Sequence, residues 1–481
     1  MLKRLGKDVA IYGGADFLFR FTQLLAVPIY AHLLSLTDFG ILSLLTVSAT
    51  LLGILAALGV NNSVQRFYFD PEVGESRRPA LVSTGLAQLI VCATGVSALA
   101  ALLLAASRST LEGDLGIPLE LTFAAVAIVL PEQLSQYLLD AARLQFAPMK
   151  FFTIALVKNL GAVLLGLLLL IEFEMGVLGI VLGIVVAAWL AVPVGLLMVR
   201  RDLTLRVDSR LWSQVFAYGY PFVLTGAAYW VFGSLGNWML GAFGSVEQVG
   251  LFAVGMKFAV VMTFVISAFA QAWSPFALRM YGEDPNYLEN WSLIFSGWFF
   301  LLSLAGLGLA LFAPELMRIL TPPQYWPAAK VLSIAAVGLV FYGTVQMTVL
   351  GVSIAKRTIL INYAAWMAAG AALILNLLLI PRFGAPGAAV ATLVAYVVLT
   401  SSLLYWTQKL HPMPLEKGKL AYCLAVSIVA LGSGIVASGM EIGIVAFLAK
   451  SALLLAAIGG AFAARIIDKR LYRIVQRKSQ A

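Results

Sequence analysis

Long blocks of apolar residues alternate with short polar connections along almost the whole chain. A helix that crosses a lipid bilayer needs roughly 20 predominantly apolar residues, and about fourteen blocks reach that length. Each block is therefore predicted to be a membrane-spanning helix. In chain order they cover residues 10–34, 40–60, 79–106, 117–139, 150–171, 176–199, 215–240, 248–276, 291–313, 327–352, 358–380, 385–406, 418–437 and 441–465.

The composition fits this pattern. The chain is 61% hydrophobic and 11% charged, and its mean hydropathy of +0.95 lies outside the range of ordinary soluble domains. No connection is long enough to hold a folded soluble domain, so catalysis in an appended domain is not expected. The first block is long and is not followed by a small-residue cleavage site, which favours a retained helix over a signal peptide. We predict an all-α polytopic membrane protein.

Cysteines and histidines add little chemistry. Cys92 and Cys423 both fall in apolar blocks, where a buried apolar role is expected rather than a disulfide. His32 and His411 have none of the neighbours that a zinc site requires. We predict neither a metal nor a cofactor.

Basic residues gather in alternate connections, and cytoplasmic connections are the ones that collect Lys and Arg. With the N-terminus in the cytoplasm, 24 of the 32 Lys and Arg residues fall on the cytoplasmic side. Both termini are therefore predicted to be cytoplasmic. This asymmetry explains the net charge of +9 without a nucleic-acid partner.

Two polar turns recur at a nearly constant offset. Residues 35–40 resemble residues 244–250, and their final glycines, Gly40 and Gly250, lie 210 positions apart. Residues 171–179 resemble residues 380–387, at offsets of 209 and 208. Six helices return a chain to its starting side, so the repeats are expected to be parallel. We predict two six-helix lobes, residues 1–205 and 206–412, followed by a helix pair and a basic tail, residues 413–481.

A few charged residues interrupt the apolar blocks. A charge within a span costs at least about 2.5 kcal/mol on insertion scales and is first interpreted as functional. The basic residues outnumber the acidic ones, which suggests a cationic cavity and an anionic cargo. The basic residues are Arg20, Lys158, Lys257 and Lys450, and the acidic residues are Asp16 and Glu132.

Four stretches of the chain resemble one transporter family. Residues 379–392, which follow Asn376, are similar to the signature of bacterial polysaccharide transporters in the multidrug/oligosaccharidyl-lipid/polysaccharide exporter superfamily. Residues 28–40 resemble the first helix and hairpin of that family, residues 59–67 its second helix, and residues 218–221 the opening of its second half. The four stretches lie within the first 410 residues.

This resemblance implies a flippase in the bacterial inner membrane that moves undecaprenyl-pyrophosphate-linked oligosaccharides through a cavity between two lobes. It also implies alternating access. Many relatives carry an acidic and a basic residue near the end of the seventh helix, whereas this chain has Gly236, Asn237 and Trp238 there. A charged role at that place is therefore not expected here.

Cationic side chains are the natural ligands of a pyrophosphate. Arg20 and Asp16 are one helical turn apart on one face, either as a structural ion pair or with Asp16 orienting Arg20 toward substrate. Lys257 lies deep in its block and is predicted to face the cavity. Lys158 is nearer the cytoplasm, where it can bind substrate or snorkel. Arg66 either receives phosphate on entry or simply follows the positive-inside rule.

The remaining intramembrane charges have other predicted roles. Lys450 lies outside the two repeated halves and is expected to snorkel toward the periplasm on the lipid side. Glu132 follows Pro131 and has two interpretations: a carboxyl group that couples proton movement to transport, or a counter-ion for Lys158 or Arg143.

Five aromatic residues are candidates for stacking on sugar rings, although such residues more often form the interfacial belt of a membrane protein. They are Tyr229, Trp230, Trp238, Trp273 and Trp298.

Two other function classes remain open at this stage. A multidrug exporter of the same superfamily would need a more acidic cavity, and a glycan polymerase or ligase would need a large periplasmic loop. We favour a monomeric transporter over an enzyme. Its expected partners are a lipid-linked oligosaccharide, membrane lipid and, as candidates, glycan-assembly proteins.

Overall fold

The computed structural model describes residues 2–71, 73–106, 118–204, 206–441, 443–464 and 466. Within these ranges the regular structure is entirely helical. The chain divides into two compact units, Met1–Trp230 and Val231–Ala481, and the division falls inside one long helix. The all-helical fold class predicted from the sequence is confirmed.

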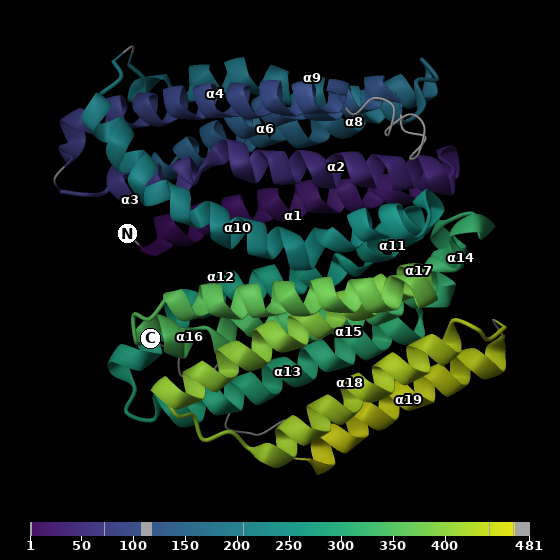
Figure 1. The fold of residues 1–481 in the computed structure, drawn as a ribbon. Helices are drawn as coiled ribbons and strands as arrows, with labels where there is room; N and C mark the ends of the chain where they lie inside the picture. Colours follow the sequence, from purple (N-terminus) through teal and green to yellow (C-terminus); the bar gives the residue numbers. More distant parts are fainter. Residues whose placement is uncertain are drawn as a thin grey trace. The chain divides into compact units, whose positions relative to one another are not determined.

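The first unit is a layered helix bundle in which α6 (Leu119–Leu144) packs against α2, α4 and α9 (Figure 1). A short π-helix, η1, links α7 and α8, and α9 ends in a 3₁₀ turn, η2. The other elements of this unit are α1 (Leu2–Leu33), α2 (Leu36–Ala57), α3 (Val60–Tyr68), α4 (Gly74–Ala106), α7 (Pro148–Ala155), η1 (Leu156–Leu160), α8 (Gly161–Ile171), α9 (Gly176–Val199), η2 (Arg200–Asp202) and the first half of α10 (Ser209–Phe243).

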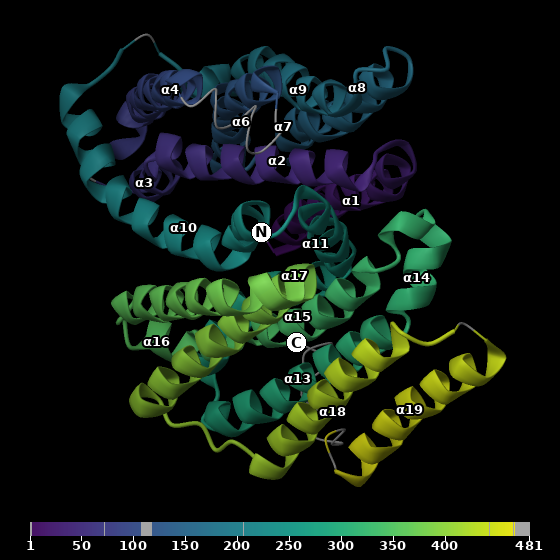
Figure 2. The same cartoon turned by 45° about the vertical axis from the view of Figure 1, so that its right-hand side comes forward.

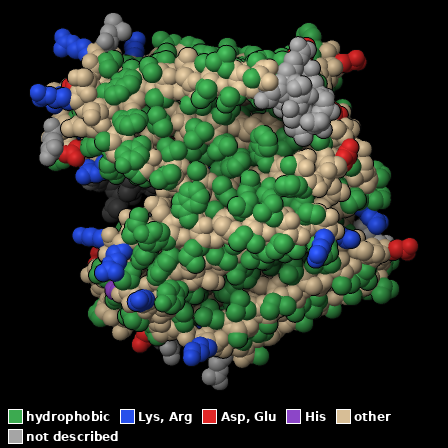
Figure 3. Space-filling model, viewed as in Figure 1, with side chains coloured by type: hydrophobic (Ala, Val, Ile, Leu, Met, Phe, Trp, Pro, Cys, Tyr) green, Lys and Arg blue, Asp and Glu red, His purple; other side chains and the backbone are tan. Residues whose placement is uncertain are grey.

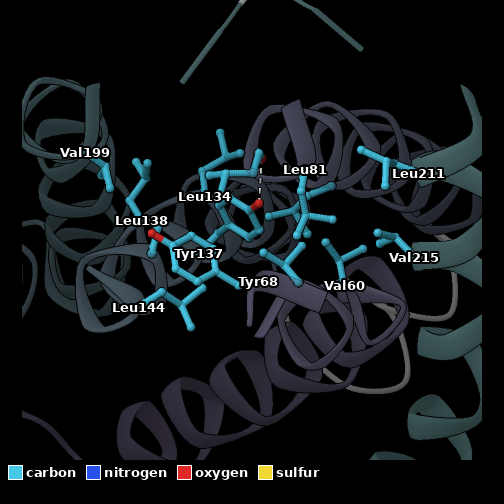
Figure 4. Packing of buried hydrophobic residues seen from close by; sticks show 14 of the residues in the cluster. Val60, Tyr68, Leu81, Leu134, Tyr137, Leu138, Leu144, Val199, Leu211 and Val215 are labelled. Atoms are coloured by element: carbon cyan, nitrogen blue, oxygen red, sulfur yellow. Dashed lines mark hydrogen bonds between the residues drawn. The ribbon is translucent and has the colours of Figure 1, made fainter. Parts of the chain in front are cut away.

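An apolar core joins α3, α4, α6, α9 and the start of α10 at one end of this unit (Figure 4). Tyr137 is buried within it and donates a hydrogen bond of 2.6 Å to the carbonyl oxygen of Val82. A buried hydroxyl without a partner would be costly, so this bond fixes the register of α4 against α6.

The second unit surrounds α15 (Ala328–Thr348), which packs against α11, α13, α17 and α18 (Figure 2). The terminal pair of α18 and α19 lies along α13. The remaining elements are α11 (Val246–Ala259), α12 (Val261–Glu283), α13 (Tyr287–Leu311), α14 (Ala313–Leu320), η3 (Pro323–Tyr325), α16 (Leu350–Ile354), α17 (Ile359–Leu410), α18 (Lys417–Ala437) and α19 (Ile444–Ala463).

Eleven helical segments among the described residues are long and apolar enough to cross a membrane. Figure 3 shows apolar side chains over the broad middle of one face, with most charged side chains near its margins. The chain is thus a multi-pass membrane protein, as predicted. The count of fourteen spans stays a prediction. One of the eleven segments, α17, is 52 residues long and covers two predicted blocks, which meet at a kink where Gly384 has non-helical backbone angles of φ 56° and ψ −134°.

Turns at equivalent positions of the two halves share local geometry. Ser35 and Ser245 are 210 residues apart, and the hydroxyl of each accepts a bond from a backbone N–H of the helix that follows. Phe146 and Lys356, also 210 apart, both have positive φ, as do Gly176 and Gly384, 208 apart. These correspondences agree with an internal repeat. The division at residues 205 and 412 stays a prediction.

Candidate functional site

Lys158 occupies an unusual backbone segment in the middle of the first unit. It lies in η1, a single turn of π-helix between α7 and α8. Such turns insert an extra residue into an α-helix and are frequent at functional sites. The Lys158 ammonium is buried, and its Nζ lies 2.7 Å from Oε1 of Glu132 and 3.3 Å from Oε1 of Gln136. Two residues of α6 therefore hold the ammonium in place.

Arg20 and Lys158 line the same cavity of about 200 Å³. Arg143 also reaches it, although its guanidinium is 3.0 Å from Oδ1 of Asp140 and lies over the Phe151 ring. Three basic side chains from α1, α6 and η1 thus surround one hollow, so the predicted convergence of Arg20 and Lys158 agrees with the geometry. The other polar lining residues are Gln23, Gln136 and Asn159.

Lys158 also lines a second cavity, of about 440 Å³. Gln23, Lys158 and Asn159 line both cavities, and the amide of Gln23 is 3.4 Å from Oδ1 of Asn159. The lining of the second cavity is mostly apolar, with its other polar groups from Thr46, Thr50, Glu132 and Gln133. Lys158 is therefore part of a wall shared between a cationic hollow and a larger, more apolar one.

The contacts of Glu132 bear on its two predicted roles, as a counter-ion and as a proton-coupling group. Glu132 is the counter-ion of Lys158, whereas Arg143 is paired with Asp140. The side chain of Glu132 is 37% exposed and borders the larger cavity. An ion-pair role is therefore evident, and a role in proton coupling stays a prediction.

The other predicted substrate ligands whose side chains the structure describes are not among the residues that line these two cavities. Arg66 lies in the last turn of α3, with an exposed side chain whose Nη1 is 3.2 Å from Oδ2 of Asp70. Lys257 lies near the end of α11 in the second unit and is exposed. The side chain of Asp16 lies outside the described residues, so its pairing with Arg20 stays a prediction.

The expectation that Lys450 snorkels on the lipid side is wrong. Its side chain is only 6% exposed, and Nζ lies 2.6 Å from Oε1 of Glu315 in α14. The ammonium is also 6.0 Å from the ring centroid of Phe312. The short helix α14 follows α13 and places a carboxylate beside α19, so the charge is neutralised inside the protein rather than at the lipid surface.

Both interpretations of the aromatic candidates fail for three of them. Trp273 and Trp298 are buried and both stack with Phe269, with ring centroids 5.6 and 3.7 Å from that of Phe269. The indole N–H of Trp230 donates to the carbonyl oxygen of Val47 at 3.0 Å, and this side chain is also buried. These three are core residues. They neither form an interfacial belt nor stack on sugar rings. Trp238, by contrast, is 42% exposed.

Sequence reasoning missed the amides at this site. Gln23, Gln136 and Asn159 all fall inside predicted spans. The sequence did hold a signal, since uncharged polar residues within apolar blocks also tend to face the interior of a helix bundle. Gln136 is one turn after Glu132 and therefore shares its face of α6.

Solved structures of transporters share this fold. The structure of the lipid II flippase MurJ in an inward closed conformation matches with a TM-score of 0.68 and 16% identity, over 95% of this chain and 99% of that one. An inward-facing multidrug resistance MATE transporter of the MOP superfamily matches with a TM-score of 0.58 and 14% identity, over 80% and 93%. A point mutant of the Vibrio cholerae MATE transporter VcmN gives 0.51 and 15%, over 84% and 98%. At these identities the likeness concerns the fold.

No curated protein matches the sequence. A family profile does: the one described as "Polysaccharide biosynthesis protein" matches residues 5–280, more than half of the chain. Three of the four stretches that carried the resemblance lie inside this range, and residues 379–392 lie beyond it. With this match, the resemblance predicted from the sequence is confirmed, and the fold is one that solved membrane transporters share. The chain belongs to the polysaccharide biosynthesis protein family.

Proposed function

We propose that this protein is a flippase that moves a polyprenyl-pyrophosphate-linked oligosaccharide across the bacterial cytoplasmic membrane by alternating access. The observation that carries the proposal is the cavity where Arg20 and Lys158 meet inside otherwise apolar helices. A pyrophosphate is an anion that two such groups can hold, because charge-assisted bonds to phosphate are short and strong. The family and the MurJ-like fold support the same cargo class.

In the proposed cycle the pyrophosphate reaches the cytoplasmic end of the protein near Arg66 and then moves to Arg20 and Lys158. Lys257, from the second unit, is proposed as a further ligand. The pyrophosphate competes with Glu132 for the Lys158 ammonium, so binding releases a carboxylate. Glu132 is proposed to take up a proton at that point and to couple transport to the proton gradient. The prenyl chain stays in lipid throughout.

The test replaces the two cations singly and together, as Arg20→Ala, Lys158→Met and the double variant. Each lost phosphate contact is expected to lower glycan export about ten- to a hundredfold, since such bonds contribute about 1.5–3 kcal/mol. The readout is surface glycan in cells that lack the native gene, at equal amounts of protein in the membrane. Arg279→Ala is the control, because its pair with Glu283 is 63% exposed on both sides.

Lys158→Met leaves Glu132 without its counter-ion, so a folding defect must be separated from a binding defect. The variant Glu132→Gln/Lys158→Met removes both charges and serves this purpose: export should stay low although the protein is stable. Normal export in the Arg20 and Lys158 double variant would refute the cationic site. Glu132→Gln alone should make export insensitive to an imposed pH gradient, and persistent sensitivity would exclude the coupling role.

A second candidate is a multidrug exporter that expels organic cations, because MATE transporters share the fold. Lys158 argues against it, since a buried ammonium repels a cationic drug. Cells that overexpress the protein should show unchanged resistance to cationic dyes. Raised resistance, with unchanged glycan export, would favour this candidate over the flippase.

A further inference from the structure

The helix α10 is long, and apart from its start, where Leu211 and Val215 lie in the apolar core, it is held at few points. It runs for 35 residues, yet among the described elements it makes only sparse contacts with any one neighbour. Its first half, up to Trp230, belongs to the first unit. Elements held by few contacts are the ones that open most easily and that move in functional cycles. The contacts that hold α10 therefore determine whether it can move away from its neighbours.

The closest of these points is a contact between two glycines. The chain turns between α2 and α3 through Leu58 and Gly59, which have φ of 45° and 67°. Gly219 of α10 lies directly against this turn. A Cβ added to Gly219 would be 2.5 Å from the Leu58 carbonyl oxygen and 2.8 Å from Oγ of Ser63. One added to Gly59 would be 2.8 Å from Cα of Gly219. The two backbones touch, and neither position has room for a side chain.

Side chains on either side of the glycines complete the contact. The hydroxyl of Ser63, fully buried, donates to the carbonyl oxygen of Val215 at 2.8 Å. The rings of Phe67 and Tyr218 meet edge to face, with centroids 5.5 Å apart. We call the contact of Leu58, Gly59 and Ser63 with Val215 and Gly219 the glycine seam.

At the glycine seam the two backbones are in close contact, but few interactions hold them together. Backbone-to-backbone contacts of this kind are individually weak. Ser63 also lies 3.1 Å from the carbonyl oxygen of Gly59 in its own helix, so its hydroxyl keeps an acceptor if α10 leaves. The aromatic side chains of α10 around Gly219, namely Tyr218, Tyr220 and Phe222, are 39–53% exposed. Opening would thus leave the Ser63 hydroxyl with an acceptor. The side-chain packing that it would break is that of the buried Val215 and of Phe67 against Tyr218.

We propose that the glycine seam is a reversible latch, closed in one state of the transport cycle and open in another. The proposal rests on alternating access but not on the identity of the cargo. It gives a physical role to residues 59–67 and 218–221, two of the stretches that carried the family resemblance. Glycines at 59 and 219 allow the latch to close fully, and the absence of large interlocking side chains allows it to open.

The test measures the state of the latch directly. Nitroxide labels are placed at Phe67→Cys and Tyr218→Cys after Cys92 and Cys423 are replaced, and the protein is returned to lipid vesicles. A latch predicts two populations by continuous-wave EPR, one with strong dipolar broadening and one without. A single broadened population that no condition of pH or added lipid-linked oligosaccharide alters would overturn the proposal.

A matched pair of glycine variants tests the mechanism of closure. Gly219→Ala should reduce the broadened population several-fold, because its methyl group meets the Leu58 carbonyl and Ser63. Gly233→Ala is the control on the same helix, since a Cβ there meets nothing within 4 Å. Equal spectra for the two variants would overturn the proposal, provided that both proteins fold, which their melting temperatures report.

Function is tested with a reducible bifunctional thiol reagent at the same two cysteines. Cross-linking should abolish export, and reduction should restore it, whereas either single-cysteine variant should be unaffected by the reagent. Full export in cross-linked protein would overturn the latch. If the unmodified protein exports no glycan, the proposed function fails, and the EPR populations still decide whether the latch exists.

Discussion

At the scale of single residues, two buried ammonium groups in this protein are held by carboxylates from other helices. Lys158 pairs with Glu132 of α6, and Lys450 pairs with Glu315 of α14. A lone charge in an apolar span is costly, and a pair with good geometry removes most of that cost. The difference between the two pairs is access: Glu132 borders a cavity, whereas Glu315 is 16% exposed and lines none of the cavities described above.

The Lys450–Glu315 pair should therefore act on stability. Lys450→Met leaves the Glu315 carboxylate buried alone and is expected to cost about 3–5 kcal/mol. Lys450→Met/Glu315→Gln removes both charges and should recover much of that loss. Reversible unfolding in detergent, followed by tryptophan fluorescence, provides the measurement. Arg279→Ala is the exposed control, expected to change stability by about 0.5 kcal/mol or less. Equal stability of the single and double variants would contradict this account.

The sequence identified which residues carry intramembrane charge, but it could not identify every partner. Glu132 lies within a predicted span and was open to consideration as a counter-ion. Glu315 is 135 positions from Lys450 and lies between two predicted spans, in a short helix that no hydrophobic block indicates. Only the packing of α19 against the second unit brings it close. The burial of Trp273 and Trp298 was hidden for the same reason, because a span's apolar pattern does not say which face meets protein.

At the scale of elements, local chemistry sets where helices begin and end, and much of it was visible in the sequence. The serines at 35 and 245 are helix caps in the turns that the repeat predicted. The π-helix was not predictable, because its residues, Leu156–Leu160, have the pattern of an ordinary apolar helix with one lysine. The extra residue of a π-turn does not change the hydrophobic pattern when the residues on all sides of the helix are apolar.

The start of α10 supplies a prediction on pH. Oδ1 of Asp208 accepts bonds from the backbone N–H groups of Arg210 and Leu211, and Oδ2 lies 2.6 Å from Nη2 of Arg77. The bond from Arg77, followed by the two backbone bonds, lowers the pKa of the Asp208 carboxyl below its usual range. The stability that it contributes is present above the ordinary pKa of Asp, about 3.9, and is lost as pH falls through the lowered value.

Melting temperatures in detergent between pH 3 and pH 7 check this. Asp208→Asn keeps a capping side chain but loses the charge, so it should melt lower than the wild type at neutral pH. Because the wild type loses the same charge in acid, the difference should shrink as pH approaches 3. A difference that stays constant with pH would show that the carboxylate charge is not what Arg77 and the helix N-terminus stabilise.

At the scale of the whole molecule, the fold class and the membrane location followed from hydropathy alone. The number of membrane-spanning helices did not follow from hydropathy alone. Among the described residues eleven helical segments qualify as spans rather than fourteen, because α1 and α6 do not qualify and α17 merges two predicted blocks. Glu132, Gln133 and Gln136 make α6 more polar. The polar residues that place α6 outside the count are the ones that line the cavities. The helix that contributes the most polar groups at the candidate site is thus one that a hydropathy criterion leaves out.

Orientation is the prediction at this scale. The excess of Lys and Arg in alternate connections predicts that both termini lie in the cytoplasm. A fluorescent protein fused after Ala481 should therefore fluoresce, and alkaline phosphatase fused there should be inactive. The matched control is phosphatase fused in the short connection near Arg318, which is predicted to be periplasmic and should be active. The opposite pattern would reverse the proposed direction of entry.

The π-helix at Leu156–Leu160 also bears on how this protein can change over generations. A π-turn holds one residue more than an α-helical turn, so deleting one residue there would restore regular winding and leave α8 in place. Only side chains within the turn, Lys158 among them, would change direction, by about 100°. The cation would leave its carboxylate without any substitution of either. The loss of a single codon in this turn is therefore expected to remove the ammonium from the candidate site while the helices on either side stay in place.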